Sequence, residues 1–474
     1  MSFTSLTFLC IVLPVTLIAY YVVQLIGRGH VVARTMAKLI LLAVSVFAYY
    51  WAASEHLITL FIAAIGTYLG ALIIDATKGA AKKLVLAVGV TACVAFLCYY
   101  KYLDYFMSQV EHFVPLSYEA PDLIQPLGIS FLVFSLISYL MDVYRGTLKA
   151  DRNILNVLLW AFFFAKIVSG PIVRYGQMFR ANEQCPAAPK LDMAVTGARR
   201  FVIGMAKKLI IANVLGQTAD MVFALDAVNT PMAWLGALCY SFQLFFDFAG
   251  SSDMAIGLGL MLGFRFEENF NYPYISKTIG EFWRRWHISL SSWLRDYLYF
   301  PLGGSRRGNV YLNLLIVMAV SGLWHGAANH FVVWGLWYGF FMILDRLYRR
   351  YIEPRFKVPA PITWAFTMLI VVFGWVIFRS GNMSQAIDIM KAMVGLHEPV
   401  FMAYGFFYYF NFHVGVTMAF AVVLSTPIVP ALKKRFGHTT LWHVLSMLCI
   451  PALLVVCYSF ILTSTYSPFL YAQF

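Results

Sequence analysis

Long apolar stretches separated by short polar ones recur along the whole chain. The clearest of them cover residues 3–25, 39–53, 57–74, 84–100, 360–378, 408–430 and 441–463. Shorter or more mixed ones cover residues 127–141, 154–168, 234–249, 310–324 and 331–344. A helix needs about 20 apolar residues to cross about 30 Å of hydrocarbon. The pattern therefore predicts an all-α polytopic membrane protein with roughly 11–13 membrane helices, some of them short or re-entrant.

Composition supports this fold class. The 474 residues are 61% hydrophobic and only 12% charged, whereas a soluble domain has about 25% charged residues. No linker, low-complexity tract or internal repeat interrupts the chain, so we expect a single domain over residues 1–474. Residues 200–216, which carry two adjacent lysines, predict a helix that lies in the membrane interface.

The positive charge is concentrated in short loops. The net charge is +13, from 35 Lys and Arg against 22 Asp and Glu. The basic residues gather at 27–38, 78–83, 144–152, 345–357 and 433–438, between apolar runs, which is the positive-inside pattern of cytoplasmic loops. This argues against nucleic acid as a partner and places both termini, and the loops 101–126 and 380–407, outside. The first 27 residues carry no charge, so we expect a retained first span and not a cleaved signal peptide.

Neither cysteines nor histidines predict a metal site. The seven cysteines lie mostly within apolar runs and none forms CxxC, which favours buried thiols. His325 and His330 lack the HExxH spacing and have no carboxylate nearby, so no metal ligands are predicted.

Residues 268–308 depart from the membrane pattern. This stretch, ENFNYPYISKTIGEFWRRWHISLSSWLRDYLYFPLGGSRRG, mixes tryptophans with arginines around His287. Aromatic rings and arginines settle at the lipid–water interface, so an interfacial anchor is one interpretation. A binding surface for a phosphorylated donor is the other.

His325 follows in SGLWHGAANH, between two apolar runs. An ionisable group at membrane depth is costly and suggests function, although a buried histidine is also often structural. Gly322 and Gly326 flank it and permit a broken helix or close backbone approach. Asp247 and Asp253, in FFDFAGSSDMAIGLGLMLGFRF, are predicted to pair with a base or to line a wet cavity.

These motifs resemble one family. EFWRRWHISLSSWLRDYLYFPLGG, followed by GLWHGAANHFVVWG and preceded by FDFAGSSDMAIGLGLMLGFRF, is similar to the membrane-bound O-acyltransferase (MBOAT) family. The segments PLGISFLVFSLISYLMDVYRG and AKIVSGPIVRY also resemble its bacterial branch, which O-acetylates alginate, cellulose or peptidoglycan.

The resemblance implies a helical fold around a narrow passage and a transmembrane O-acetyltransferase. The two characteristic histidines of the family fall on His325 and His287. The donor would be a cytoplasmic thioester, acetyl-CoA, with no bound cofactor. The acceptor would be an envelope polysaccharide, reached with a periplasmic esterase-like partner, and the location would be the bacterial inner membrane. We interpret six further residues as donor- or substrate-binding: Arg284, Arg285, Trp286, Arg306, Arg307 and Asp253.

The C-terminal residues FLYAQF, 469–474, follow an F-x-Y-x-x-F pattern. The pattern resembles the tail of bacterial members of this branch and that of a small peptide of teichoic-acid D-alanylation, which implies that Tyr471 carries the acyl group. A phenol has a pKa near 10 and a thiol near 8.5, so a phenyl ester keeps most of the transfer potential of a thioester. An aromatic anchor at the membrane interface is the alternative.

Two other functions compete with acyl transfer. Apolar spans with buried charges also suit a glycan or lipid transporter or flippase, but transporters usually contain structural repeats, and none is found here. A scaffold for a polysaccharide-synthesising complex would not need so many polar motifs. We therefore expect an enzyme.

Overall fold

The computed structural model describes residues 2–27, 30–115, 118–119, 121, 123–167, 170–179, 191–396, 404–464 and 466. Within these ranges the chain is helical and contains no β-strand. The helices group into two compact units. Unit 1 comprises the described residues within 1–201 and 252–267, and unit 2 comprises those within 202–251 and 268–466.

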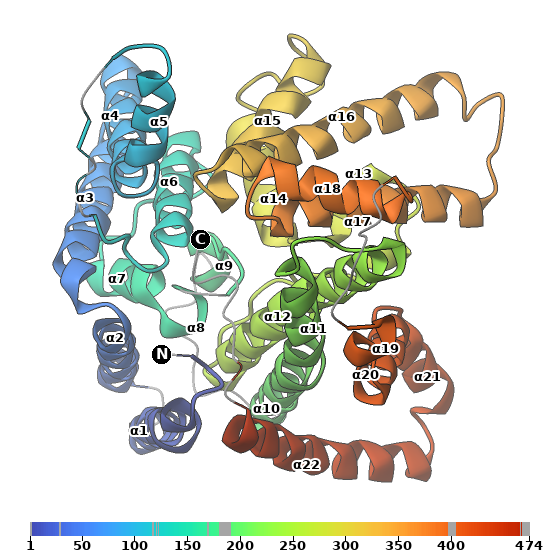
Figure 1. The fold of residues 1–474 in the computed structure, drawn as a ribbon. Helices are drawn as coiled ribbons and strands as arrows, with labels where there is room; N and C mark the ends of the chain where they lie inside the picture. The colour runs from blue at the N-terminus through green and yellow to red at the C-terminus, as the bar shows by residue number, and fades with distance from the viewer. Residues whose placement is uncertain are drawn as a thin grey trace. The chain divides into compact units, whose positions relative to one another are not determined.

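Unit 1 holds the N-terminal helices, drawn in blue to teal in Figure 1. Helices α3, α4 and α6 pack against one another, as do α1 and α2. Its helices are α1 (Leu13–Ile26), α2 (Val31–Ala52), α3 (Leu57–Ala76), α4 (Gly79–Leu97), α5 (Leu103–Glu111), α6 (Ile129–Arg145), α7 (Ile154–Phe162), α8 (Phe164–Ile167) and α9 (Tyr175–Met178). Helices α10 (Leu191–Ala206) and α12 (Thr230–Met261) contribute to both units.

Unit 2 holds most of α12 and every later helix. Its other helices are α11 (Asn213–Phe223), α13 (Ile279–Arg285), α14 (Ile288–Leu294), α15 (Val310–His325), α16 (Asn329–Tyr351), α17 (Ala360–Arg379), α18 (Met383–Met393), α19 (Phe406–Tyr409), α20 (Phe412–Leu424), α21 (Ile428–Phe436) and α22 (Thr440–Thr463). Polar side chains define where several of them begin: Asn309, Asn382, Asn411 and Thr439 each accept a hydrogen bond from a backbone N–H of the first turn, which satisfies a donor that the helix itself cannot pair.

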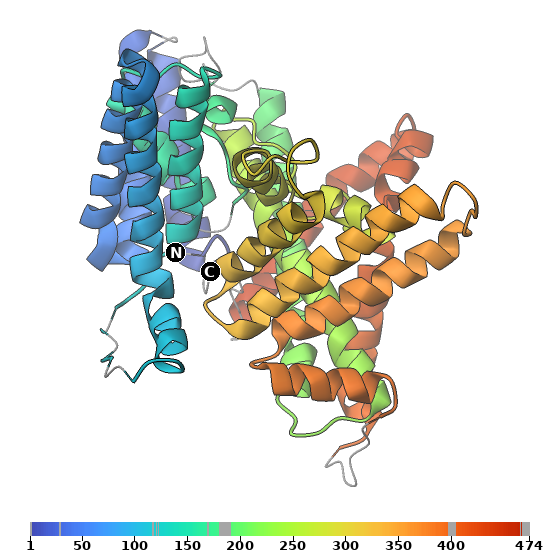
Figure 2. The same ribbon diagram turned by 90° about the horizontal axis from the view of Figure 1, so that it is seen from above.

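Helices α15 and α16 pack closely because glycines face each other across them. A Cβ on Gly322 would lie 2.1 Å from the carbonyl oxygen of Phe331, and one on Gly335 would lie 2.1 Å from that of Met318. Only glycine fits such an approach. The two helices run side by side in Figure 1 and again in Figure 2, and this contact fixes the position of His325 at the end of α15.

The helices confirm the predicted polytopic membrane fold. Among the described residues, seven are long and apolar enough to cross a membrane, or eight if α20 and α21, which meet at 64°, form one broken span. The remaining predicted runs also form helices, but shorter or more polar ones: 127–141 falls on α6, 154–168 on α7 and α8, 310–324 on α15 and 331–344 on α16. All four belong to the shorter or more mixed apolar runs of the sequence, whereas the fifth run of that group, 234–249, lies within the candidate span of α12.

Three local predictions differ from the structure. The predicted outer loop 101–126 begins as helix, because a π-helical turn at Cys98–Tyr102 continues α4 into α5 as far as Glu111. The run 408–430 bends just before Ile428, where Pro427 precedes α21, and proline disfavours helical backbone at the residue before it. The segment 200–216 was predicted to lie in the membrane interface, but its Lys208 is buried, with 1% exposed. Lys208 forms an ion pair with Asp247, as a buried charge needs a partner.

Candidate active site

His287 occupies a strained connection between two short helices. It lies between α13 and α14 with φ 43° and ψ 57°, the left-handed region, which only one other non-glycine residue among the described ones adopts. The backbone of Asn269 helps to hold this connection, because the Asn269 backbone carbonyl accepts a hydrogen bond from the backbone N–H of Ile288 at 2.9 Å. Backbone strain of this kind costs about 1–3 kcal/mol and concentrates at functional sites.

The Asn269 side chain also sets the protonation of His287. Its Oδ1 accepts hydrogen bonds from the backbone N–H and hydroxyl of Ser289, at 3.1 and 2.8 Å, and lies 3.1 Å from Nδ1 of His287. An oxygen can only accept, so Nδ1 carries the hydrogen and Nε2 keeps its lone pair. Nε2 is buried and has no hydrogen-bond partner within the described ranges. Burial lowers the pKa of His287 from 6.5 to about 3, so the ring is neutral at physiological pH.

His325 ends α15 at the break that the flanking glycines predicted. The next residue, Gly326, is extended, and a Cβ there would lie 2.1 Å from the ring of Phe331. The imidazole is 4% exposed. It packs edge-on against Trp334 and Phe378, with ring centroids 5.0 Å away in each case.

Trp324 connects the two histidines. Its ring lies 4.8 Å from that of His325 and 6.1 Å from that of His287, measured between centroids. Phe248 contacts His287 edge-on at 4.5 Å. The structure thus brings together two histidines that lie 38 positions apart in the sequence, within one aromatic cluster of unit 2.

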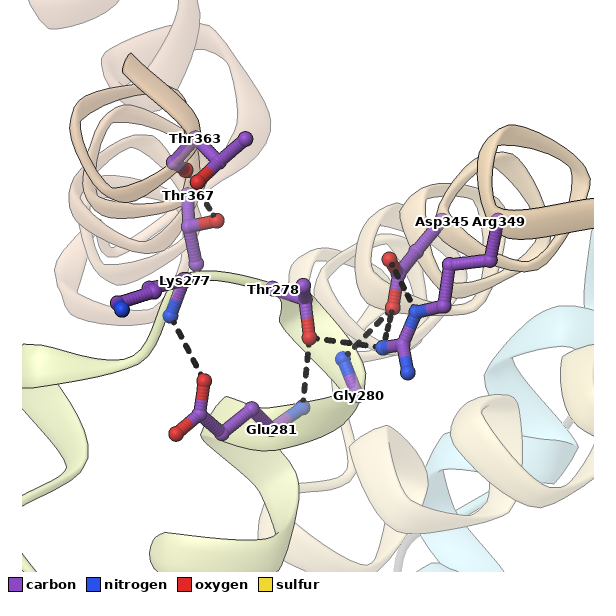
Figure 3. A network of polar contacts seen from close by, with 8 residues as sticks. All are labelled: Lys277, Thr278, Gly280, Glu281, Asp345, Arg349, Thr363 and Thr367. Carbon is purple, nitrogen blue, oxygen red and sulfur yellow. Dashed lines mark hydrogen bonds and ion pairs between the residues drawn. The ribbon is translucent and has the colours of Figure 1, made fainter. Parts of the chain in front are cut away.

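A polar network holds α13, which leads into His287 (Figure 3). Thr278 caps the helix by accepting from the backbone N–H of Glu281 at 3.1 Å. Arg349 of α16 donates to Thr278 at 2.8 Å and to Asp345 at 2.6 Å, and Asp345 in turn accepts from the backbone N–H of Gly280 at 3.2 Å. This network fixes the start of α13 against α16.

The predicted donor-binding residues of the dense segment differ in exposure. Arg284, Arg306 and Arg307 are exposed, and the last two lie in a turn whose Gly303 has φ 107°. Arg285 is partly exposed and pairs with Glu281 at 2.9 Å. Three of the four arginines therefore present their charge to solvent, as binding of an anionic donor requires.

The other predicted members of the site have different surroundings. Trp286 is 3% exposed and packs on Trp375 with centroids 4.8 Å apart, so it belongs to the aromatic core. Asp253 belongs to unit 1, where Arg200 binds it at 2.7 Å, and Asp247 pairs with Lys208. These pairs agree with the expectation that membrane carboxylates find a base. Tyr471 lies outside the described residues.

Two contributions were missed at the level of sequence. Asn269 orients His287 from 18 positions away, and nothing in the spacing indicated it. Trp334 is fully buried beside His325, and its indole N–H has no acceptor in the described part of the chain. The only signal was the tryptophan itself, because a buried indole N–H normally finds a partner. No three His, Cys, Asp or Glu side chains of the described residues form a metal-binding group.

The site contains two histidines within an aromatic cluster of an all-helical membrane protein. One of them is neutral and has an available ring nitrogen. Such a site is suited to proton transfer where little water is present. Residues 3–384 match the family model of the membrane-bound O-acyltransferases, MBOAT. The chain belongs to this family. It is therefore an O-acyltransferase. This result favours the enzyme over the two alternative functions, a glycan or lipid transporter and a scaffold protein.

Among proteins with similar sequences are three bacterial acyl-transferring proteins. The chain is 42% identical over 405 residues to the probable alginate O-acetylase AlgI of Pseudomonas putida, a match that covers 83% of this chain and 80% of the relative. It is 33% identical over 425 residues to the peptidoglycan O-acetyltransferase of Helicobacter pylori, covering 83% and 80%. A teichoic acid D-alanyltransferase of Bacillus subtilis is 31% identical over 299 residues, covering 58% of this chain and 75% of the relative.

Proposed function

We propose that this protein transfers an acetyl group from a cytoplasmic thioester, acetyl-CoA, across the inner membrane to an envelope polysaccharide of the alginate kind. His325 is the general base, and Tyr471 is the acyl carrier. The pairing of His325 and His287 around Trp324 carries the proposal, together with the similarity to alginate and peptidoglycan O-acetylating proteins.

The chemistry proceeds in two transfers. In the first, His325 takes the proton of the Tyr471 hydroxyl, the phenolate oxygen bonds to the thioester carbonyl carbon, and the carbon–sulfur bond breaks. The thiolate of coenzyme A leaves and accepts a proton. In the second, an acceptor hydroxyl attacks the tyrosyl ester and the phenol leaves. Thiol and phenol have pKa values of about 8.5 and 10, so the ester remains reactive enough for this second transfer.

The remaining residues have supporting roles in this proposal. Neutral His287, held by Asn269, accepts a hydrogen bond at Nε2 and so orients a reacting hydroxyl. The guanidinium groups of Arg284, Arg306 and Arg307, with Arg285, bind the phosphates of the donor. Trp286 supports the arginines from the aromatic core of unit 2, and Asp253, paired with Arg200 in unit 1, is a further substrate-binding residue of the proposal.

The second transfer needs a further protein. The chain contains no G-x-S-x-G sequence, the elbow on which many esterases carry their nucleophile. A periplasmic esterase-like partner therefore completes acetylation of the polymer. Delivery on that side requires the tail with Tyr471 to lie in the periplasm. The basic loops predict the same side for the N-terminus.

Complementation tests this function. The gene is expressed in an alginate-producing host that lacks its own membrane O-acetylase, and acetyl esters on the secreted polymer are measured. We expect acetylation to return, and a second host that lacks peptidoglycan O-acetylation serves as the comparison. Failure in both hosts with a correctly inserted protein would contradict the proposed acceptor class.

A further inference from the structure

The segment that follows α22 is fastened to α11 by Tyr466. The phenolic hydroxyl of Tyr466 donates to Oδ2 of Asp220 at 2.5 Å, and the side-chain amide of Asn213 donates to the Tyr466 carbonyl at 3.2 Å. Ser464 closes a local turn, because its hydroxyl accepts from the backbone N–H of Tyr466 at 3.2 Å. Three hydrogen bonds thus hold Tyr466, which lies about half the chain length away from α11 in the sequence.

Arg379 adds a charged hydrogen bond to the Tyr466–Asp220 contact. Its guanidinium donates to the other carboxylate oxygen, Oδ1 of Asp220, at 2.6 Å and lies over the ring of Phe223 at 5.3 Å. Asp220 therefore receives one neutral and one charged donor, and hydrogen bonds to ionised groups are the stronger kind. Burial and the hydrogen bond to Asp220 raise the pKa of Tyr466, so the phenol stays protonated and remains a donor.

The surface beneath Tyr466 is shaped for it. A Cβ on Gly216 would lie 2.9 Å from the Tyr466 hydroxyl oxygen and 2.5 Å from Nε2 of Gln243, so a side chain at position 216 would push the tyrosine away. Glycine at this position is what allows the ring to approach α11.

Two acceptors at this surface have no donor among the described residues. Oδ1 of Asn213 and Oε1 of Gln243 are unsatisfied, and the two side chains are only 5% and 1% exposed. A buried acceptor without a donor costs about 1–3 kcal/mol, so such groups normally have a partner. The side-chain amide of Asn213 also donates to the Tyr466 carbonyl, so the Asn213 acceptor lies beside the docked tyrosine.

We propose that Tyr466 docks the chain that follows α22 on α11, and that the Tyr466–Asp220 pair is the latch that positions the tail for acyl transfer. The occupant of this surface is Tyr466 of the same chain. Tyr471 is five positions after Tyr466, and an extended chain spans at most about 3.6 Å per residue, so the Tyr471 Cα lies within about 18 Å of that of Tyr466. By fixing Tyr466 on α11, the latch limits the region that Tyr471 can reach. Its effect on catalysis rests on the proposed role of Tyr471.

Hydrogen–deuterium exchange of the full-length protein in nanodiscs tests the latch. Tyr466→Phe removes only the hydroxyl, and Tyr408→Phe, at an exposed ring of the same unit, is the matched control. We expect the peptide covering 464–474 to exchange about 10- to 100-fold faster in Tyr466→Phe, as loss of a hydrogen bond to a charged group predicts, with α11 and α12 unchanged. Acetyl transfer should become slower at unchanged donor KM, and Tyr408→Phe should match the wild type in both measurements.

Each outcome decides a separate question. Unchanged exchange in Tyr466→Phe would overturn the latch, whatever the activity. Faster exchange with an undiminished transfer rate would overturn its positioning role. Tyr471→Phe should keep the wild-type exchange pattern while blocking transfer, so an active Tyr471→Phe protein counts against the acyl carrier and not against the docked segment.

Discussion

Nδ1 of His287 lies 3.1 Å from the amide oxygen of Asn269, and this contact decides which imidazole nitrogen is available for chemistry. The same oxygen receives both hydrogen-bond donors of Ser289, so it cannot be the amide nitrogen and Nδ1 must carry the hydrogen. Nε2 is left as a buried base. This arrangement predicts a histidine that stays neutral over the working range of the enzyme.

The buried neutral state of His287 predicts a pH dependence of stability. The pKa is about 3 in the folded protein and 6.5 ordinarily, so below pH 6.5 the unfolded chain binds a proton that the folded one does not. The stabilisation is therefore complete above pH 6.5 and is lost as the pH falls toward 3. At pH 5 the loss is about 2 kcal/mol.

His287→Gln, which cannot titrate, isolates this contribution. Thermal unfolding at pH 7.5 and pH 5 should show a smaller loss of stability for the variant than for the wild type. Equal losses in the two proteins would mean that His287 is accessible to protons in the folded state.

His325→Ala should abolish polymer acetylation while the protein remains inserted. Loss of a general base typically lowers the rate by about 10²–10⁴-fold. His443→Ala, at an exposed position of α22, should retain normal activity. The readout is the acetyl content of the polymer at matched protein levels, and near wild-type acetylation by His325→Ala would remove this residue from the mechanism.

Charge reversal of Arg306 and Arg307 to glutamate should raise the donor KM more than it lowers kcat if, as proposed, these exposed guanidinium groups bind the donor phosphates. Reversal of Lys433 and Lys434 on α21 is the matched control, since both pairs would serve equally as topology signals. Steady-state kinetics with acetyl-CoA separate the two roles. If both reversals change insertion alike and neither changes donor KM, the arginines only orient the chain.

Hydropathy was enough to predict the membrane fold, because the cost of crossing hydrocarbon acts on each segment separately. The end of the helix at Gly326 could also be predicted, since glycines flank His325 in the sequence. The bend at Pro427 was not predicted, because the apolar run continues through it and composition alone did not reveal the change of direction.

Contacts between distant segments could not be predicted from spacing. Asp220 and Tyr466 are 246 positions apart, and each is an ordinary residue in its local sequence. Asn269 gave no sign that it would hold His287, since the contact depends on the left-handed backbone at position 287. The sequence indicated the histidines and arginines by type, and the folded chain determined which of them lie together.

The proposed transfer passes through an acetyl ester on Tyr471, and mass spectrometry detects that ester. Purified wild-type protein is incubated with acetyl-CoA without acceptor, and the C-terminal peptide containing Tyr471 is weighed by mass spectrometry. We predict a mass increase of one acetyl group on wild type and none on His325→Ala or on Tyr471→Phe, which keeps the aromatic ring and loses only the hydroxyl. An unlabelled wild-type tail, together with full polymer acetylation by Tyr471→Phe, would show that Tyr471 carries no acyl group and would leave the tail as an anchor.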